Sequence, residues 1–96
     1  METQHALIEQ YELVKEIHYS FDGIEPKIIG RIYKITLGAN AKFMWDINYH
    51  CRLVHEASVY IPGGPFGNSS GGAENKLDIY IKRFEQAVEW KRNESF

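Results

Sequence analysis

The stretch Phe43–Val54, FMWDINYHCRLV, decides how the rest of the chain is interpreted. Apolar and polar side chains alternate along it. Because successive side chains of a strand point to opposite faces of a sheet, this alternation predicts a half-buried β-strand. The apolar face holds Phe43, Trp45, Ile47, Tyr49, Cys51 and Leu53. The second face holds Met44, Asp46, Asn48, His50 and Arg52, and we expect it to be available for contact with another molecule.

The size and composition of the chain predict one globular domain over residues 1–96. Hydrophobic residues make up 44% of the chain and charged residues 25%, as in ordinary globular proteins. Aromatic residues make up 14%, which is more than a small core readily holds, and Trp and Tyr side chains favour interfaces. We therefore expect some aromatic side chains to contact a partner.

Charge and cysteine content argue against several classes of protein. The formal net charge is −2, so the chain lacks the basic footprint typical of nucleic-acid-binding domains. No apolar stretch approaches the roughly 20 residues needed to span a membrane, and METQHALIEQ lacks the basic region of a signal peptide. The single cysteine, Cys51, cannot form an internal disulfide. We expect a cytoplasmic protein without membrane contact.

The N-terminal segment allows two predictions. Residues 1–10 are expected to fray or to form a short helix capped by Thr3. Residues 11–20 fit the periodicity of either a helix or a strand. A strand over residues 13–21 is favoured, because Asp22-Gly23 follows directly and readily forms a tight hairpin turn.

Further strands are predicted in the middle of the chain. Pro26 marks the entry to the segment KIIGRIYKITL, within which Gly30 indicates a bulge or a close backbone approach. The short link Gly38–Ala41 makes this segment the antiparallel neighbour of Phe43–Val54. Residues 57–61 alternate again and predict a short last strand.

A glycine-rich loop and a helix complete the predicted fold. Residues 62–72, PGGPFGNSSGG, predict a loop, and Ser70 or a following glycine caps the helix after it. One side of this helix is apolar and consists of Leu77, Tyr80, Ile81, Phe84, Ala87 and Val88. Residues 92–96 are expected to fray. The predicted fold class is α+β, an antiparallel meander of three or four strands with the C-terminal helix packed on one face.

No arrangement of residues predicts catalysis or metal binding. His50 and Cys51 are adjacent in the sequence, but strand alternation puts them on opposite faces. Cys51 falls on the apolar face, where burial disfavours the thiolate needed for nucleophilic chemistry. The loop at residues 62–72 lacks the lysine of a phosphate-binding loop. We expect a non-enzymatic protein without cofactor or metal, with thiol chemistry at Cys51 as the catalytic alternative.

Two surfaces are predicted to contact a partner, the polar face of the strands and the part of the helix outside its apolar side. Both carry aromatic, Met, His or Arg side chains, which make good interface anchors. The candidate interface residues are Met44, Asn48, His50, Arg52, Tyr60, Phe66, Ile79, Arg83 and Trp90. We expect a small protein-binding module that acts as an adaptor, subunit or stoichiometric inhibitor, with another protein or a second copy as partner. The alternative is a nucleic-acid-binding domain that uses Arg52, His50 and Tyr60 on the polar face of the sheet.

Two resemblances bear on these hypotheses. With a helical N-terminal segment, the order α-β-β-β-α resembles the double-stranded-RNA-binding domain over most of the chain. That family enters its last helix through a basic, lysine-rich stretch, whereas this chain has GGAENKLDIY with Lys76 as its lone lysine, so no phosphate-binding role is carried over. In size and in its lack of catalytic motifs, the chain is also similar to compact accessory and inhibitor proteins of phages and mobile elements.

Overall fold

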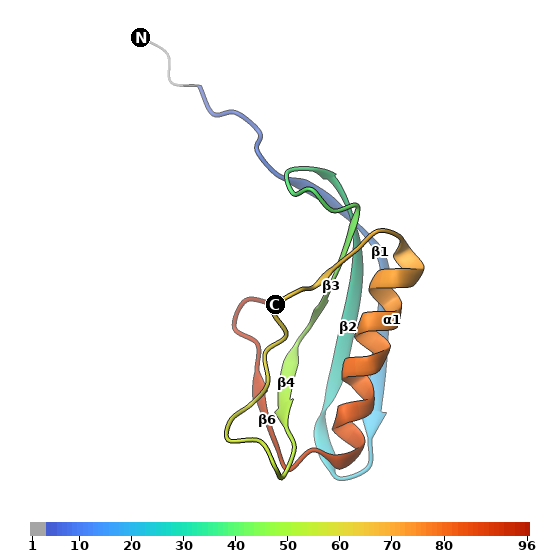
Figure 1. Ribbon diagram of the computed structural model, residues 1–96, viewed down its shortest axis with the longest axis vertical. Coiled ribbons are helices and arrows are strands. Elements are labelled where there is room, and N and C mark those ends of the chain that lie inside the picture. Colours follow the sequence, from blue (N-terminus) through green and yellow to red (C-terminus); the bar gives the residue numbers. More distant parts are fainter. Residues whose placement is uncertain (1–3) are drawn as a thin grey trace.

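A four-stranded antiparallel sheet with one helix on it forms the body of the protein (Figure 1). The computed structural model describes residues 4–96. Within these residues the sheet has the order β1-β2-β3-β5, and β4 and β6 form a separate two-stranded ribbon. The elements are β1 (Gln10–Phe21), β2 (Ile24–Leu37), β3 (Phe43–Ile47), β4 (Tyr49–Arg52), β5 (Phe66–Gly67), α1 (Ser70–Lys82) and β6 (Glu89–Arg92). The predicted α+β class, with an antiparallel sheet and a C-terminal helix on it, is confirmed.

The hairpin of β1 and β2 resolves the ambiguity of the N-terminal segment in favour of a strand. Gly23 takes a positive φ of 83° in the tight turn between the two strands, a conformation that glycine adopts without strain. Residues 4–9 contain no helix, so the short N-terminal helix is wrong there, and its predicted cap Thr3 lies outside the described residues. Pro26 lies inside β2 and not at its entry. The pairing register with β1 shifts next to it, which accommodates the missing N–H.

The stretch Phe43–Val54 does not form one strand, which corrects the sequence-based prediction. It breaks at Asn48, so that β3 pairs with β2 while β4 turns away to pair with β6. The Ile29 N–H donates to Asn48 Oδ1 at 2.7 Å, and Asn48 Nδ2 donates to the Lys27 carbonyl at 3.0 Å. The side chain is 4% exposed and takes the place that backbone groups of a continuing strand would occupy.

The C-terminal part of the chain also differs from its prediction. Residues 57–61 form no strand, and β6 occupies the place beside β4. The predicted loop contains the short strand β5. In the segment 92–96, which was expected to fray, the Asn93 N–H donates to the Asn48 carbonyl at 2.8 Å. The Arg31 guanidinium lies 4.2 Å from the ring centre of Phe96. The tail therefore packs against the sheet.

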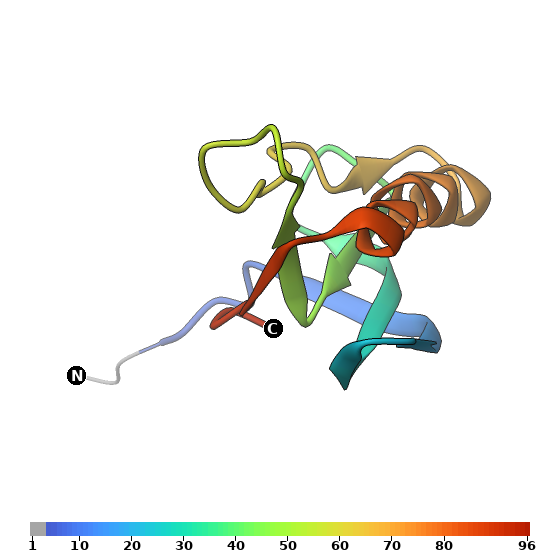
Figure 2. The same cartoon turned by 90° about the horizontal axis from the view of Figure 1, so that it is seen from below.

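Helix α1 covers one face of the sheet, and the segment between β4 and β5 lies beside it on the same side (Figure 2). The N-cap of α1 is Ser69 and not the predicted Ser70, since the Gly72 N–H donates to Ser69 Oγ at 3.0 Å. A 3₁₀ turn at Arg83–Gln86 ends the helix. Residues 87–88 therefore lie outside it, contrary to prediction, because the chain reverses there into β6.

The core lies between α1 and the sheet. Gly30 of β2 confirms the predicted close approach, because a Cβ at this position would lie 2.6 Å from Cδ2 of Leu77. Cys51 is fully buried, as predicted. The buried hydrophobic residues are Ile24, Ile28, Ile32, Trp45, Ile47, Cys51, Ala73, Leu77, Tyr80, Ile81 and Phe84.

Candidate protein-binding groove

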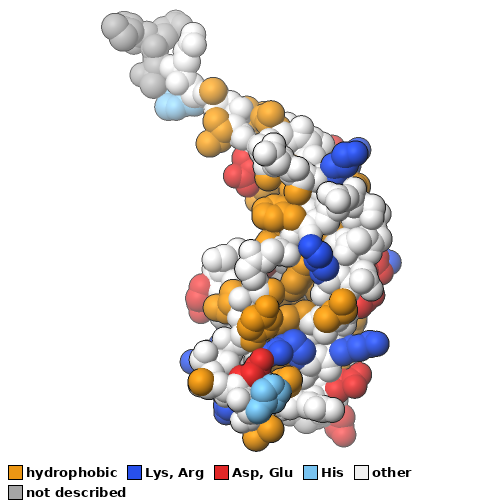
Figure 3. Space-filling model, in the orientation of Figure 1, with side chains coloured by type: hydrophobic (Ala, Val, Ile, Leu, Met, Phe, Trp, Pro, Cys, Tyr) orange, Lys and Arg blue, Asp and Glu red, His pale blue; other side chains and the backbone are white. Residues whose placement is uncertain are grey.

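A groove of about 460 Å³ lies between α1 and the segment that follows β4. In Figure 3, hydrophobic side chains gather in the hollow between these two parts of the chain. Trp45 and Tyr80 are 4% and 3% exposed, whereas Tyr60 and Ile79 are 49% and 62% exposed. The groove is lined by Trp45, Tyr60, Pro62, Gly63, Gly64, Lys76, Ile79, Tyr80 and Arg83. Two buried aromatic rings thus accompany two exposed apolar side chains in one concave surface.

The helix contributes one of its sides to this groove. Lys76, Ile79, Tyr80 and Arg83 stand at positions i, i+3, i+4 and i+7, and such residues share one side of a helix. Leu77 and Ile81, on the neighbouring side, are buried in the core. The amphipathic packing of α1 onto the sheet therefore fixes that three of its side chains face the groove, together with Arg83 at its C-cap.

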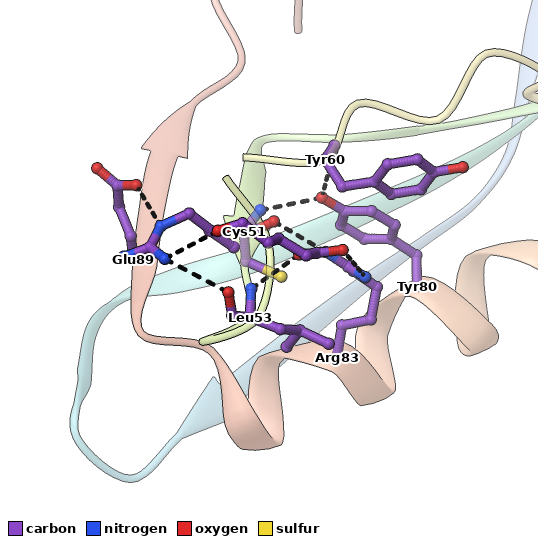
Figure 4. Close-up of polar contacts among 8 residues, drawn as sticks. Cys51, Leu53, Tyr60, Tyr80, Arg83 and Glu89 are labelled. Carbon is purple, nitrogen blue, oxygen red and sulfur yellow. Dashed lines mark hydrogen bonds and ion pairs between the residues drawn. The ribbon is translucent and has the colours of Figure 1, made fainter. Parts of the chain in front are cut away.

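Tyr80 connects the groove to the strands beneath it. Its hydroxyl donates to the Tyr60 carbonyl at 2.6 Å and accepts from the Cys51 N–H at 2.9 Å (Figure 4). The rings of Tyr60 and Tyr80 are stacked, with centres 6.2 Å apart. Burial raises the pKa of Tyr80 to about 12, so the hydroxyl stays protonated and able to donate. These contacts hold the loop side of the groove against α1.

Arg83 fixes the same loop through a bidentate ion pair. Its Nη2 and Nη1 donate to Oε1 and Oε2 of Glu56 at 2.6 and 3.0 Å, and Nη2 also donates to the Cys51 carbonyl at 3.1 Å. The hydrogen bonds from Arg83, followed by the one from the Leu53 N–H, lower the pKa of Glu56 to about 2. The guanidinium lies 5.0 Å from the ring centre of Tyr60. Glu56 and Arg83 therefore connect the segment that follows β4 to the end of α1.

The charges that line the groove are positive. Within residues 4–96, the charged side chains lining it are Lys76 and Arg83, with no carboxylate among them. Lys76 Nζ donates to the Phe66 carbonyl at 2.5 Å. The carboxylate of Glu74 instead pairs with Lys15 of β1 at 3.1 Å, away from the groove. Lys76 of α1 thus faces the groove, whereas Glu74 faces β1.

Three of the predicted interface residues, Tyr60, Ile79 and Arg83, come together in this groove. Two others meet elsewhere, since Met44 of β3 pairs with Phe66 of β5. Met44 alternates with the buried Trp45, so this pair lies on the sheet face that α1 does not cover. There they line a second hollow of about 420 Å³, together with Ile8, Glu9, Tyr11, Ile35, Gly38 and Ala39.

The other four candidates lie in or beside the β4–β6 ribbon and are engaged within the protein. Asn48 is buried, and Arg52 donates from Nε to Glu89 Oε1 at 3.0 Å. His50 is half-buried and lies edge-on to a ring of α1 at 5.9 Å, and burial lowers its pKa. Trp90 is half-buried on β6 and packs against the core, so it does not belong to the helix. The break at Asn48 turns β4 away from the sheet, so the continuous polar face predicted for Phe43–Val54 does not form.

Several lining residues were not predicted to belong to a site. Trp45 and Tyr80 were predicted to belong to the core, and their rings also form part of the groove. The helical spacing from Lys76 to Arg83 is the sequence signal that would have found one side of it. Residues 61–64 carry no comparable signal, because their position depends on contacts between distant segments, such as the hydrogen bonds of Tyr60 with Tyr80 and Cys51.

Comparisons with known proteins do not assign the chain. No protein-family model, curated protein or solved structure matches it.

Among residues 4–96, no three His, Cys, Asp or Glu side chains are grouped so that they could hold a metal ion. Across the same described residues, no helix is long and apolar enough to cross a membrane. Burial raises the pKa of the Cys51 thiol, which opposes thiolate formation.

Proposed function

We propose that this protein is a non-catalytic protein-binding module of the cytoplasm that holds its partner in the groove beside α1. The observation that carries the proposal is the exposure of Tyr60 and Ile79 above a buried aromatic floor. Large apolar side chains that stay exposed around a concave surface are characteristic of interaction sites. The network of Arg83, Glu56 and Tyr80 holds this surface in shape before any partner arrives. Binding would therefore cost little ordering of the loop.

The test is a substitution that blocks the groove without disturbing the core. Ile79→Asp places a charge on a side chain that is 62% exposed, so the fold should be retained while an apolar partner is repelled. Val54→Asp is the matched control, because Val54 is 78% exposed and lies outside the groove lining. In affinity capture followed by reconstitution with the purified partner, wild type and Val54→Asp should bind equally and Ile79→Asp at least tenfold more weakly. Equal binding by all three proteins would refute the proposal.

Self-association is a second part of the proposal and rests on the hollow around Met44 and Phe66. Tyr11, Leu13 and Phe66 are 46%, 54% and 41% exposed, and β1 is an edge strand of the sheet. Exposed apolar side chains beside an open strand edge favour association with a second copy. Light scattering during size-exclusion chromatography should detect a dimer that Phe66→Asp dissociates. A wild-type monomer at millimolar concentration would remove this part of the proposal.

Nucleic-acid binding through His50, Arg52 and Tyr60 has less support. Arg52 is paired with Glu89, and His50 is half-buried beside Tyr80. An electrophoretic shift at low salt that disappears at high salt would favour it, because phosphate contacts release counterions.

A further inference from the structure

We propose that the partner enters the groove as an extended peptide segment with an acidic residue next to Lys76 and apolar residues above Ile79 and Tyr60. This inference rests on the proposed function and specifies the chemistry of what binds. It follows from the length of the groove, the order of side chains along α1 and the charge at each end.

The helix sets the length of the segment. Lys76 and Arg83 are seven residues apart, and at 1.5 Å per residue they are separated by about 10 Å along the helix axis. An extended chain advances about 3.3 Å per residue, so three to four residues span this distance. Ile79 and Tyr80 lie between the two ends, which places the apolar part of the segment in the middle of the groove.

The two cationic ends of the groove are not equivalent. Arg83 is already neutralised by Glu56, and its guanidinium lies over the rings of Tyr60 and Tyr80 at 5.0 and 5.2 Å. Lys76 forms no ion pair with any residue of the described chain, since the partner of its Nζ is the Phe66 carbonyl. The uncompensated positive charge of the groove therefore lies at the Lys76 end. Charge complementarity therefore favours a peptide with an acidic residue at the Lys76 end and an uncharged, preferably aromatic, residue at the Arg83 end.

A selection from a displayed library of random heptapeptides tests this. The targets are wild type, Lys76→Glu, Ile79→Asp and the control Val54→Asp. Wild type and Val54→Asp should enrich peptides in which Asp or Glu lies one to three positions from aromatic or aliphatic residues. Lys76→Glu should lose the acidic residue from its enriched peptides and select Lys or Arg instead. Ile79→Asp should enrich no apolar segment, and near-UV circular dichroism would establish that all four proteins are folded.

A synthetic copy of the most enriched peptide gives the quantitative arm. Replacing its acidic residue by alanine should weaken binding to wild type by about two- to fivefold at low salt, the effect of one exposed ion pair, and by less at high salt. The same replacement should not weaken binding to Lys76→Glu. Excess unlabelled Ile79→Asp protein, whose own groove should not take up the peptide, should not displace the peptide from wild type, because displacement would identify the occupant as a second copy and overturn the inference.

The failure of this inference can be separated from the failure of the proposed function. Peptides that lack an acidic residue but are lost on Ile79→Asp would overturn the charge assignment and leave the groove as a binding site. If no peptide distinguishes wild type from Ile79→Asp, an extended segment is excluded as the occupant. The capture experiment with Ile79→Asp and Val54→Asp then still decides whether a folded partner uses the groove.

Discussion

Asn48→Asp is the substitution that tests most directly how β3 and β4 are joined. The change keeps the shape of the side chain and replaces one donor by an acceptor. The carboxylate could still accept from the Ile29 N–H, but its second oxygen would face the Lys27 carbonyl, to which Nδ2 now donates at 3.0 Å. A carbonyl left unpaired costs about 1–3 kcal/mol, and an unpaired buried charge brings the total to roughly 3–5 kcal/mol. The free energy of unfolding of small domains is about 5–15 kcal/mol, so the variant should be severely destabilised at pH 7.

The sign of the pH dependence separates this explanation from a mere packing defect. Burial beside a carbonyl raises the pKa of the introduced carboxyl above its unfolded value of about 3.9, since only the protonated form donates to Lys27. The variant should therefore approach the stability of the wild type as the pH falls towards about 4. Urea unfolding followed by tryptophan fluorescence at pH 7 and pH 5 would measure the difference between the two proteins. Asn48→Ala should lose comparable stability at both pH values, and Asn40→Asp, in an exposed turn, should change it by about 0.5 kcal/mol or less.

The reasoning about Asn48 would be refuted by either of two results. One is an Asn48→Asp variant as stable as the wild type at pH 7. The other is a stability difference that does not narrow at pH 5, because the loss would then not come from a missing proton facing the Lys27 carbonyl.

Three further predictions concern the core and the groove. Gly30→Ala should lower the free energy of unfolding by about 1–3 kcal/mol, because the new methyl group overlaps Leu77. In a double-mutant cycle, the variant with both Gly30→Ala and Leu77→Ala should lose less stability than the sum of the two single variants. Strict additivity would contradict the close contact. The stabilisation that ionised Glu56 provides should be present above its ordinary pKa of 4.5 and lost as the pH falls towards about 2. If the free energy of unfolding of Glu56→Gln falls with acid pH as steeply as that of wild type, this prediction is wrong. Cys51 should react slowly with a thiol reagent in the folded protein and rapidly in urea, because it is fully buried with a raised pKa; rapid labelling of the folded protein would show an accessible thiol.

Alternation predicted which side chains enter the core but not where a strand ends. Trp45, Ile47 and Cys51 are buried as the pattern of Phe43–Val54 required. In sequence, Asn48 is indistinguishable from an exposed polar residue of such a strand. Its hydrogen bonds to Lys27 and Ile29 join residues about twenty positions apart, and no local pattern records a partner at that distance.

The end of the helix was mispredicted for a related reason. Residues 87–90 continue the apolar spacing of α1, so local periodicity favours a longer helix. Pairing of β6 with β4 overrides that preference, since Trp90 lies opposite Cys51 in the ribbon. The groove follows the same division. Its helical side can be derived from spacing, whereas its loop side depends on contacts between distant segments, such as the hydrogen bonds of Tyr60 with Tyr80 and Cys51.

The ribbon of β4 and β6 also determines when the groove can appear during folding. The hairpin of β1 and β2 joins neighbouring segments, whereas the Arg52–Glu89 bond of the ribbon closes a separation of 37 residues. Long closures lose more chain entropy before any contact compensates it, so pairings of this kind slow folding. Tyr80 and Arg83 reach the backbone of Cys51 across 29 and 32 residues. We therefore expect a refolding chain to form its hairpin first and to acquire a binding surface only in the last step, when the ribbon closes.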